Sequence, residues 1–246
     1  GIGTTFINND NLNTFYHLFE SRVLVHNNLF YKKCDQLLYE SENVEMFNPF
    51  GCYFLKHKVP DLIYNNLLSE INFVDNNLKN DDFVKDNDHS HYLAGKNSYQ
   101  IRVNETFLKK SKLEDYILNI GSHYLEKNNL HSNNLHMGNM WINFSYKGDY
   151  NPLHNHDSLL SGVIYIENSS FEGAKNNVAG RSSFNEPGTT NFVHSLNNHP
   201  LNKFTYVNQF EKQKLLLFPS WLSHWVNPNN LDDKRITVAF NILGDL

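Results

Sequence analysis

Short apolar segments separated by turns fill the second half of the chain and limit the folds that it can adopt. Met140–Phe144 and Leu159–Ile166 are rich in branched and aromatic residues, with the turn sequence Lys147-Gly148-Asp149 between them. Four more segments of this kind follow: Phe192–His194, Phe204–Val207, Leu215–Phe218 and Ile236–Phe240. Many short strands at this spacing predict an antiparallel sandwich or barrel.

The first half of the chain has helical patterns instead. Pro60 begins an expected helix whose apolar residues run from Leu62 to Ile71, in keeping with the preference of proline for a first helical turn. A second helix is expected over Leu113–Lys127, with a buried stripe at three- and four-residue spacing. Residues 75–100 are polar and predicted to form a surface loop, and Phe50–Leu55 is predicted to be a short strand. The predicted fold is therefore mainly β, with flanking helices packed against the outside of the β core.

Two parts of the chain differ in pattern. Residues 1–48 have apolar residues at helical spacing and no group that points to chemistry, so they are predicted to form a helical extension. Residues 49–246 are predicted to form one domain, with helical support over about 50–130 and the β core over about 137–246.

Charge and composition exclude several classes of protein. The net charge is −5, and no cluster of basic residues is larger than the short group around Lys109. Nucleic acid is therefore not an expected partner. No apolar run approaches the roughly 20 residues of a membrane span, so no membrane partner is expected either. The two cysteines, Cys34 and Cys52, are too few for a disulfide framework and are expected to be reduced thiols of a cytoplasmic protein.

Three histidines carry the predicted chemistry. His154 and His156 are two residues apart, a spacing that points both imidazoles to one side of an extended strand. His224 follows the strand predicted at Leu215–Phe218. A non-haem Fe(II) oxygenase takes three protein ligands on one face, usually two histidines and a carboxylate, and leaves positions for a cosubstrate and O₂. The order and spacing of His154 and His224 fit the two histidine positions of such a site.

An arginine and a threonine complete the predicted site. Arg235 lies at the start of the last predicted strand, and a buried guanidinium has the planar fork that a carboxylate needs. Arg235 is therefore predicted to hold the far carboxylate of 2-oxoglutarate. Thr237 is two residues further along the strand, so its hydroxyl faces the same way and is a second predicted contact.

Around these residues the sequence resembles a known family. The resemblance is carried by Trp141–Asn143, Gly148–His156, Ser161–Tyr165, Phe184–Pro187, Leu217–His224 and Arg235–Asn241. These stretches look like the 2-oxoglutarate/Fe(II) oxygenases of bacteria and marine phages, which are related to the prolyl 4-hydroxylase-like enzymes. The likeness covers about residues 50–246.

The resemblance implies a double-stranded β-helix core, the jelly roll that is also found in cupins. It implies that His154 and His224 bind iron and that Arg235 binds 2-oxoglutarate. The related enzymes carry a carboxylate two residues after the first histidine, and this chain has His156 there. The third ligand is therefore open between the imidazole of His156, the carboxylate of Asp157 and a water molecule.

Further site residues are expected from the same likeness. Trp141, Asn143 and Tyr165 are expected on strands that line the pocket, where Asn143 would contact 2-oxoglutarate. Tyr165 is either a second contact of 2-oxoglutarate or a core tyrosine of its strand, which is the more usual role of such a residue. The polar segment that contains His89 and His91 is expected to be a surface loop that could form part of a lid.

The predicted activity is hydroxylation of an unactivated C–H bond with Fe(II), 2-oxoglutarate and O₂, in the cytoplasm of a bacterial or phage-infected cell. The expected substrate is a prolyl or other peptide residue by analogy, with a small molecule as the other option. Two further functions remain open. One is a cupin-type metal enzyme that uses His154, His156 and His224 without 2-oxoglutarate, and the other is a non-catalytic jelly-roll binding or virion module.

Overall fold

The computed structural model describes residues 44–47, 53–93, 95–168, 187–194, 205–229 and 234–246. The chain divides into two compact units, Gly1–Glu42 and Asn43–Leu246, of which the first lies outside the described residues. The extension predicted over residues 1–48 therefore falls almost wholly outside the described part, as do both cysteines, and its boundary stays a prediction. No helix within the described ranges is long and apolar enough to span a membrane.

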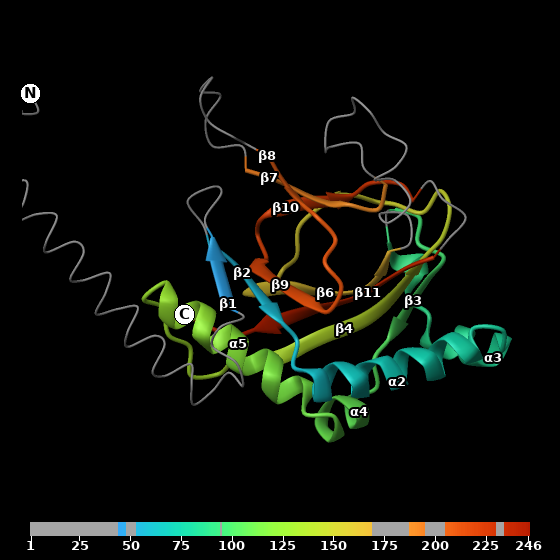
Figure 1. Ribbon diagram of the computed structural model, residues 1–246, viewed down its shortest axis with the longest axis horizontal. Coiled ribbons are helices and arrows are strands. Elements are labelled where there is room, and N and C mark those ends of the chain that lie inside the picture. The colour runs from blue at the N-terminus through green and yellow to red at the C-terminus, as the bar shows by residue number, and fades with distance from the viewer. Residues whose placement is uncertain (1–43, 48–52, 94, 169–186, 195–204, 230–233) are drawn as a thin grey trace, which may run out of the picture. The chain divides into compact units, whose positions relative to one another are not determined.

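In the described part of the second unit, antiparallel strands form two sheets that face each other (Figure 1). The larger sheet has the order β1 (Val44–Phe47), β2 (Phe54–Lys58), β9 (Lys214–Pro219), β6 (Leu160–Asn168), β11 (Arg235–Leu243), β4 (His136–Ser145) and β3 (Tyr99–Arg102). The smaller sheet has the order β5 (Asn151–His154), β10 (Ser223–Val226), β7 (Thr190–Val193) and β8 (Thr205–Asn208). From β4 onward the chain passes back and forth between the sheets, with β7 and β8 as neighbours in the smaller one. This alternation is the topology of a jelly roll, so the predicted fold class is confirmed.

The inner faces of the two sheets meet at an apolar cluster. Phe192 of β7 packs edge-on against Phe54 of β2 and Phe218 of β9, with ring centroids 4.9 and 4.8 Å apart. All three side chains are buried. Full burial of one such side chain stabilises a fold by about 1.5–3 kcal/mol, so this contact does much to hold the sheets together. Beside the cluster, the space between the sheets contains a cavity of about 460 Å³.

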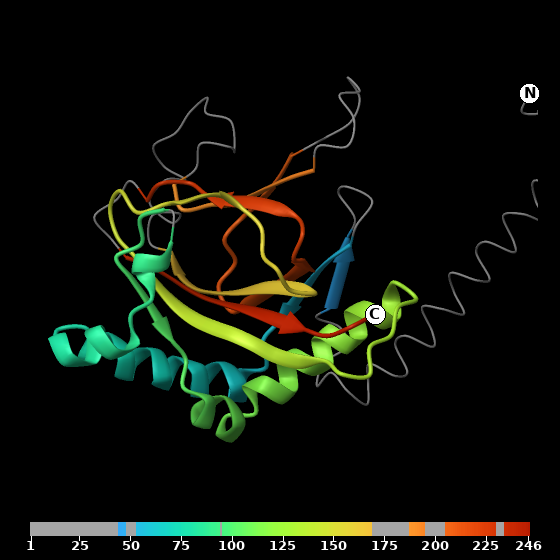
Figure 2. The ribbon, with the colours of Figure 1, turned by 180° about the vertical axis from the view of Figure 1, so that it is seen from behind.

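Helices lie on the side of the larger sheet that faces away from the smaller one (Figures 1 and 2). They are α2 (Asp61–Asn77), which has Pro60 as its N-cap, α4 (Glu105–Lys110) and α5 (Leu113–Lys127). Tyr116 of α5 shares a hydrogen bond of 2.6 Å with His57 of β2. Gly121 of α5 lies against Ile242 of β11, where an added Cβ would be 2.8 Å from the Cδ1 atom. The outer helical layer that the sequence predicts is therefore present.

The prediction of one surface loop over residues 75–100 is wrong. The segment contains the end of α2, the helix α3 (Asp81–Asn87), the 3₁₀ helix η2 (Ser90–Tyr92) and the start of β3. α3 buries none of its residues, so it has no apolar period for the sequence to reveal. Its first turn is fixed by Asn80, whose side chain accepts hydrogen bonds from the backbone N–H groups of Asp82 and Phe83.

The bounds of one predicted strand also need correction. The strand predicted at Phe50–Leu55 begins at Phe54 and runs to Lys58. In α2, the apolar run begins at Leu62, which is 75% exposed, whereas Ile63 and Leu67 are buried. The buried stripe of α2 therefore starts one residue later than the apolar run suggests.

Gly162 of β6 lies so close to Phe240 that a side chain should not fit. An added Cβ would lie 2.2 Å from Cζ of the Phe240 ring and 2.6 Å from Cε2. We expect Gly162→Ala to lower the free energy of unfolding by about 1–3 kcal/mol, because a buried ring must move. Urea denaturation would measure the change. Phe240→Leu should recover part of the loss in the same variant, and no recovery would mean that this contact is not the cause.

Candidate active site

Strand pairing brings together three histidines that are far apart in the sequence. β5 and β10 pair so that His154 lies directly opposite His224. His156 follows His154 by two residues, and its backbone N–H donates to the carbonyl of Ser220 at 3.0 Å. One ring nitrogen from each histidine lies within 4.8 Å of the others, and Nε2 of His156 is 3.3 Å from Nε2 of His224.

Backbone carbonyls determine which nitrogen is available on two of the rings. Nδ1 of His154 donates to the carbonyl of Pro152 at 2.7 Å, and Nδ1 of His224 donates to that of Leu222 at 3.0 Å. A neutral imidazole that donates from Nδ1 has its lone pair on Nε2. Such a second hydrogen bond is also the usual support of a metal-bound histidine, because it fixes both the tautomer and the ring orientation.

Burial keeps these imidazoles neutral. Burial, with smaller effects of the His154 and His156 rings, lowers the pKa of His224 to about 3. Burial and the nearby His154 ring lower the pKa of His156 to about 4, and burial also lowers the pKa of His154. The rings of Phe192 and Phe218, with centroids 5.6 and 5.1 Å from that of His224, supply part of this apolar surrounding. Neutral imidazole is the form that binds a metal ion.

The cluster fits a divalent transition-metal ion. Two imidazole nitrogens bound to one ion at about 2.1 Å, with an angle of about 90–110°, are about 3.0–3.4 Å apart, which matches the pair formed by His156 and His224. Imidazole ligands suit iron, zinc, copper or nickel rather than magnesium or calcium. Asp157 is exposed and lines a separate surface hollow with His136 and Asp245. Within the described residues, the three histidines are the one group with this metal-ligand spacing.

The histidines share the cavity between the sheets with alternate residues of β4 and β11. Successive side chains of a strand point to opposite faces, so every second residue of these strands faces the cavity. The residues are Asn139, Trp141, Asn143 and Ser145 of β4 and Arg235, Thr237, Ala239 and Asn241 of β11. Four residues that the sequence predicts for the site, Trp141, Asn143, Arg235 and Thr237, are among them.

Arg235 brings a buried positive charge to this cavity. The residue is 4% exposed, and its Nε atom is buried without a hydrogen-bond partner among the described residues. Its Nη1 donates to the hydroxyl of Thr237 at a long 3.5 Å, and no carboxylate in the described part of the chain forms an ion pair with it. Burial lowers the pKa of Arg235, but a guanidinium stays charged at neutral pH. A buried charge without a counter-ion costs several kcal/mol, so the site suits an anionic ligand.

Two neighbours orient the side-chain amide of Asn143. Its Oδ1 accepts hydrogen bonds from Nδ2 of Asn97 and Nε2 of Gln100, each at 3.1 Å. The NH₂ group of Asn143 is then left to donate into the cavity. Asn143 is the register partner of Thr237, two residues from Arg235 on the same face, so this donor lies on the arginine side of the cavity.

Tyr165, predicted among the cosubstrate contacts, is instead the core tyrosine that the sequence also allows, and His89 takes part in the cavity wall. Tyr165 is 2% exposed and is not among the residues that line the cavity; its hydroxyl donates to Oγ1 of Thr190, which does line it. His89, in the polar segment expected to form a lid, lines the cavity, whereas His91 does not.

Sequence reasoning did not single out Thr190, Asn97, Gln100 or Gly188. Each is small or polar and lies on a short strand or a loop, where such residues usually face solvent. Gly188 has a φ of +66°, and an added Cβ would lie 3.0 Å from Cδ of Arg235, so it makes room for the arginine. Thr190 could have been found from its place two residues before the apolar Phe192 on β7, because residues two apart on a strand face the same side.

Residues 139–241 match the model of a protein family described as "Putative 2OG-Fe(II) oxygenase". This segment contains the three histidines and Arg235. A comparison with curated proteins found no match.

Solved structures resemble this chain in fold. AviO1 from Streptomyces viridochromogenes Tue57 is 10% identical with a TM-score of 0.55, over 78% of this chain and 89% of that chain. HygX from Streptomyces hygroscopicus, solved with nickel and 2-oxoglutarate bound, is 12% identical with a TM-score of 0.50, over 86% and 87%. A prolyl-4-hydroxylase from Pseudomonas putida is 12% identical with a TM-score of 0.47, over 78% and 93%. The likenesses to AviO1 and HygX support the jelly-roll fold.

Substitution of His156 and Asp157 distinguishes the possible third metal ligands. We expect His156→Ala to weaken Fe(II) or Mn(II) binding at least about tenfold, because one of three clustered imidazoles is lost. Asp157→Asn should leave metal affinity unchanged, since the exposed carboxylate is outside the cluster. Anaerobic Fe(II) titration or electron paramagnetic resonance of Mn(II) would measure both. The opposite pattern would assign the third position to Asp157, and no change in either variant would assign it to water.

Proposed function

Residues 139–241 of this chain belong to the 2OG-Fe(II) oxygenase family, and from that premise we propose that the cavity binds Fe(II) on His154, His156 and His224 and 2-oxoglutarate beside Arg235. The chain is thus a 2-oxoglutarate/Fe(II)-dependent oxygenase. One observation carries the assignment of residues. A cluster of three imidazoles and a buried arginine, which has no carboxylate partner among the described residues, line the same cavity.

The histidines would hold the metal through neutral ring nitrogens. For His154 and His224, the carbonyls of Pro152 and Leu222 leave Nε2 as the ligand atom. His156 is the third ligand in this proposal, because its ring is in the cluster while the carboxylate of Asp157 is exposed elsewhere.

Bound Fe(II) supplies the O₂ chemistry, in which 2-oxoglutarate loses CO₂ to become succinate, one oxygen atom enters succinate and the other enters a C–H bond of the substrate. The chain itself positions the reactants and keeps water away from them. The rings of Phe192 and Phe218 beside His224 exclude water from one side of the cluster. A water-poor pocket limits side reactions and strengthens the electrostatic contacts inside it.

Arg235 would bind the far carboxylate of 2-oxoglutarate through its planar donor fork. The Thr237 hydroxyl accepts from Nη1 of Arg235, so its own proton is left for a carboxylate oxygen. The NH₂ group of Asn143, which Asn97 and Gln100 orient, adds a neutral donor on the same side. A cation with neutral donors around it favours an anionic ligand over an uncharged one.

The proposed substrate is a peptide, with a prolyl residue as the first hydroxylation target to test. Support comes from the cavity wall, where the amides of Gln100, Asn139 and Asn241 accompany the ring of Trp141. Side-chain amides can pair with the C=O and N–H groups of a peptide backbone, and an indole ring packs well on an aliphatic ring.

Removal of Arg235 tests the cosubstrate site. Under anaerobic conditions, addition of 2-oxoglutarate to the Fe(II)-loaded protein should produce a weak visible charge-transfer band. We expect Arg235→Ala to raise the Kd for 2-oxoglutarate by about a hundredfold or more, because a buried charge pair is lost, while Fe(II) affinity changes little. The matched control is Arg102→Ala, since Arg102 also lines the cavity but is half exposed and lies 3.6 Å from Glu105. Equal loss in both variants, or no band in the wild type, would contradict the proposal.

Turnover of peptides tests the substrate class. We expect the loaded enzyme to form succinate faster when a mixture of proline-containing peptides is added, and mass spectrometry to find one added oxygen atom in a peptide. Trp141→Ala should raise the peptide KM while leaving the Kd for 2-oxoglutarate near the wild-type value, because the ring is assigned to the substrate side. No turnover of any peptide, alongside turnover of another class of compound, would refute this substrate.

A further inference from the structure

Three serines form a chain of hydrogen bonds that leads from the loop of His156 to the wall of the cavity. The hydroxyl of Ser158 is 2.6 Å from that of Ser220, which is 2.8 Å from that of Ser161. The hydroxyl of Ser161 donates to Oδ1 of Asn241 at 2.8 Å. The carbonyl of Ser220 accepts from the backbone N–H of His156. Ser161 and Asn241 line the cavity, so the serines connect its wall to a residue of the histidine cluster.

Each serine hydroxyl has one proton, and this fixes the direction of the chain. Ser158 has two acceptors in reach, the hydroxyl of Ser220 at 2.6 Å and the carbonyl of Leu160 at 3.5 Å. The shorter contact takes the proton, because O–H···O hydrogen bonds are usually shorter than about 3.0 Å. Ser220 therefore accepts from Ser158 and donates to Ser161, which donates to Asn241. The reverse direction would leave the proton of Ser158 with the long contact alone.

This direction determines which end of the Asn241 amide faces the cavity. Because Oδ1 accepts from Ser161, the hydrogens are on the other end of the amide. Asn241 and Ser161 are register partners on β11 and β6, so their side chains lie together on one face of the sheet. Within the described residues the NH₂ group of Asn241 has no acceptor, and it is left to donate into the cavity.

A β-bulge also helps to aim Asn241. The register of β11 against β4 shifts between Phe240 and Ile242. Asn241 is therefore opposed by two residues, Gly138 and Asn139. An added Cβ on Gly138 would lie 3.4 Å from Cβ of Asn241 and 3.2 Å from its carbonyl oxygen, so the glycine leaves room for this arrangement. Bulges beside active sites commonly re-aim a side chain in this way.

Asn241 is far from the proposed cosubstrate site. Nη1 of Arg235 is 3.5 Å from the hydroxyl of Thr237, and Asn241 is four residues further along β11, about 13 Å by the rise of a strand. The five-carbon chain of 2-oxoglutarate is too short to contact both ends. Arg235 is 4% exposed, whereas Asn139, opposite Asn241, is exposed. The cavity is thus open on the side of Asn241 and buried on the side of Arg235.

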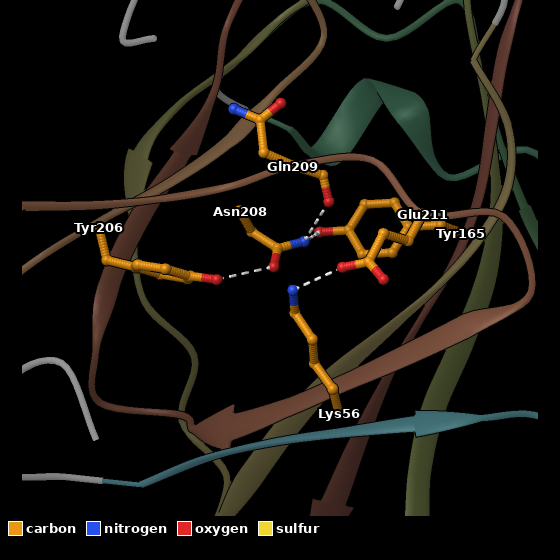
Figure 3. Close-up of polar contacts among 6 residues, drawn as sticks. All are labelled: Lys56, Tyr165, Tyr206, Asn208, Gln209 and Glu211. Atoms are coloured by element: carbon orange, nitrogen blue, oxygen red, sulfur yellow. Dashed lines mark hydrogen bonds and ion pairs between the residues drawn. The ribbon is translucent and has the colours of Figure 1, made fainter. Parts of the chain in front are cut away.

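Packed and hydrogen-bonded side chains fill the space behind Thr190, on the buried side (Figure 3). The hydroxyl of Tyr206 donates to Oδ1 of Asn208 at 3.1 Å, and Nδ2 of Asn208 donates to the hydroxyl of Tyr165 at 2.9 Å. Tyr165 belongs to the apolar core between the sheets and donates to Oγ1 of Thr190 at the cavity wall. The substrate is therefore expected on the exposed side of the cavity, near Asn139.

We propose that Asn241 is a specificity-determining residue, whose NH₂ group donates to a carbonyl oxygen of the peptide substrate, and that the serine chain orients this amide. The inference rests on the proposed function, because it assigns a role in substrate binding to the same cavity. Asn241 contacts the substrate, whereas Ser161, Ser220 and Ser158 are positioning residues that act through it. A peptide carbonyl has no proton, so it pairs with an NH₂ group and would be repelled by an oxygen in the same place.

Two substitutions of Asn241 test the donor. The probe is the peptide that the wild type hydroxylates fastest in the proline-containing mixture, and its Kd is measured by anaerobic calorimetry on the full chain loaded with Fe(II) and 2-oxoglutarate. Asn241→Ala should raise this Kd about three- to tenfold, through loss of one neutral hydrogen bond. Asn241→Asp keeps the shape and the acceptor for Ser161 but replaces NH₂ with oxygen, so it should raise the Kd about tenfold or more. The affinities for Fe(II) and 2-oxoglutarate should not change in either variant.

Substitution of Ser161 tests the orientation of the amide. Ser161→Ala should raise the peptide Kd about threefold, because the amide can then turn its oxygen to the substrate. The same change should have no further effect in the Asn241→Ala background. The matched control is Ser111→Ala, which removes another buried serine hydroxyl, one that donates to the carbonyl of Leu108 at 3.2 Å outside the cavity. This control should lower thermal stability and leave the peptide Kd unchanged.

The outcomes are distinct. A peptide Kd that is unchanged in Asn241→Ala, or as low in Asn241→Asp as in the wild type, would overturn this inference. Additive effects of Ser161→Ala and Asn241→Ala would also overturn it, and all of these results leave the proposed oxygenase intact. A wild type that binds Fe(II) and 2-oxoglutarate but no peptide would overturn this inference together with the proposed substrate class. A wild type that binds Fe(II) but not 2-oxoglutarate would overturn the proposed function itself.

Discussion

The register of strand β11 is the constraint on which both the core and the site depend. Neighbouring residues of a strand face opposite ways, so β11 buries Ile236, Val238 and Ile242 on one face and presents Arg235 and Thr237 to the cavity on the other. The strand is paired on both sides, with β4 and β6, which holds this register. A shift by one residue would move the charge of Arg235 into the apolar layer under the helices, and the cost of burying it there excludes the alternative.

Unsatisfied polar atoms gather around the same arginine. Nε of Arg235 and both polar side-chain atoms of Asn168, its register partner, are buried and form no hydrogen bond with the described residues. Native proteins carry few such atoms, because each costs about 1–3 kcal/mol. The contact of Phe192 with Phe54 and Phe218 offsets this cost elsewhere between the sheets. A ligand that satisfies Arg235 would add to stability by mass action, so the site and the fold are thermodynamically linked.

Those parts of the structure that rest on apolar periodicity could be predicted from the sequence, and those that rest on polar contacts could not. The strands of the core and helix α5 have continuous or periodic apolar residues, and their positions agree with the predictions to within a few residues. Helix α3 depends on the Asn80 cap and has no buried face, so the sequence predicts a loop there. In the cavity, the histidines and Arg235 are recognisable from the sequence by residue type. Thr190 is not, because its hydrogen bond comes from Tyr165 of another strand, which in turn accepts one from Asn208.

In the proposed site, His156 at the third ligand position changes what the rest of the site must do. A carboxylate there would leave Fe(II) with one net positive charge, whereas three neutral imidazoles leave two, which balance the two negative charges of 2-oxoglutarate before Arg235 is counted. The ion is then held without a charged ligand, so its binding depends on imidazoles that stay unprotonated. The apolar rings of Phe192 and Phe218 beside His224, and the low pKa that burial gives it, meet this need. The same rings that hold the two sheets together thus keep the proposed metal ligand His224 neutral, so packing and the proposed chemistry cannot be varied independently in this jelly roll.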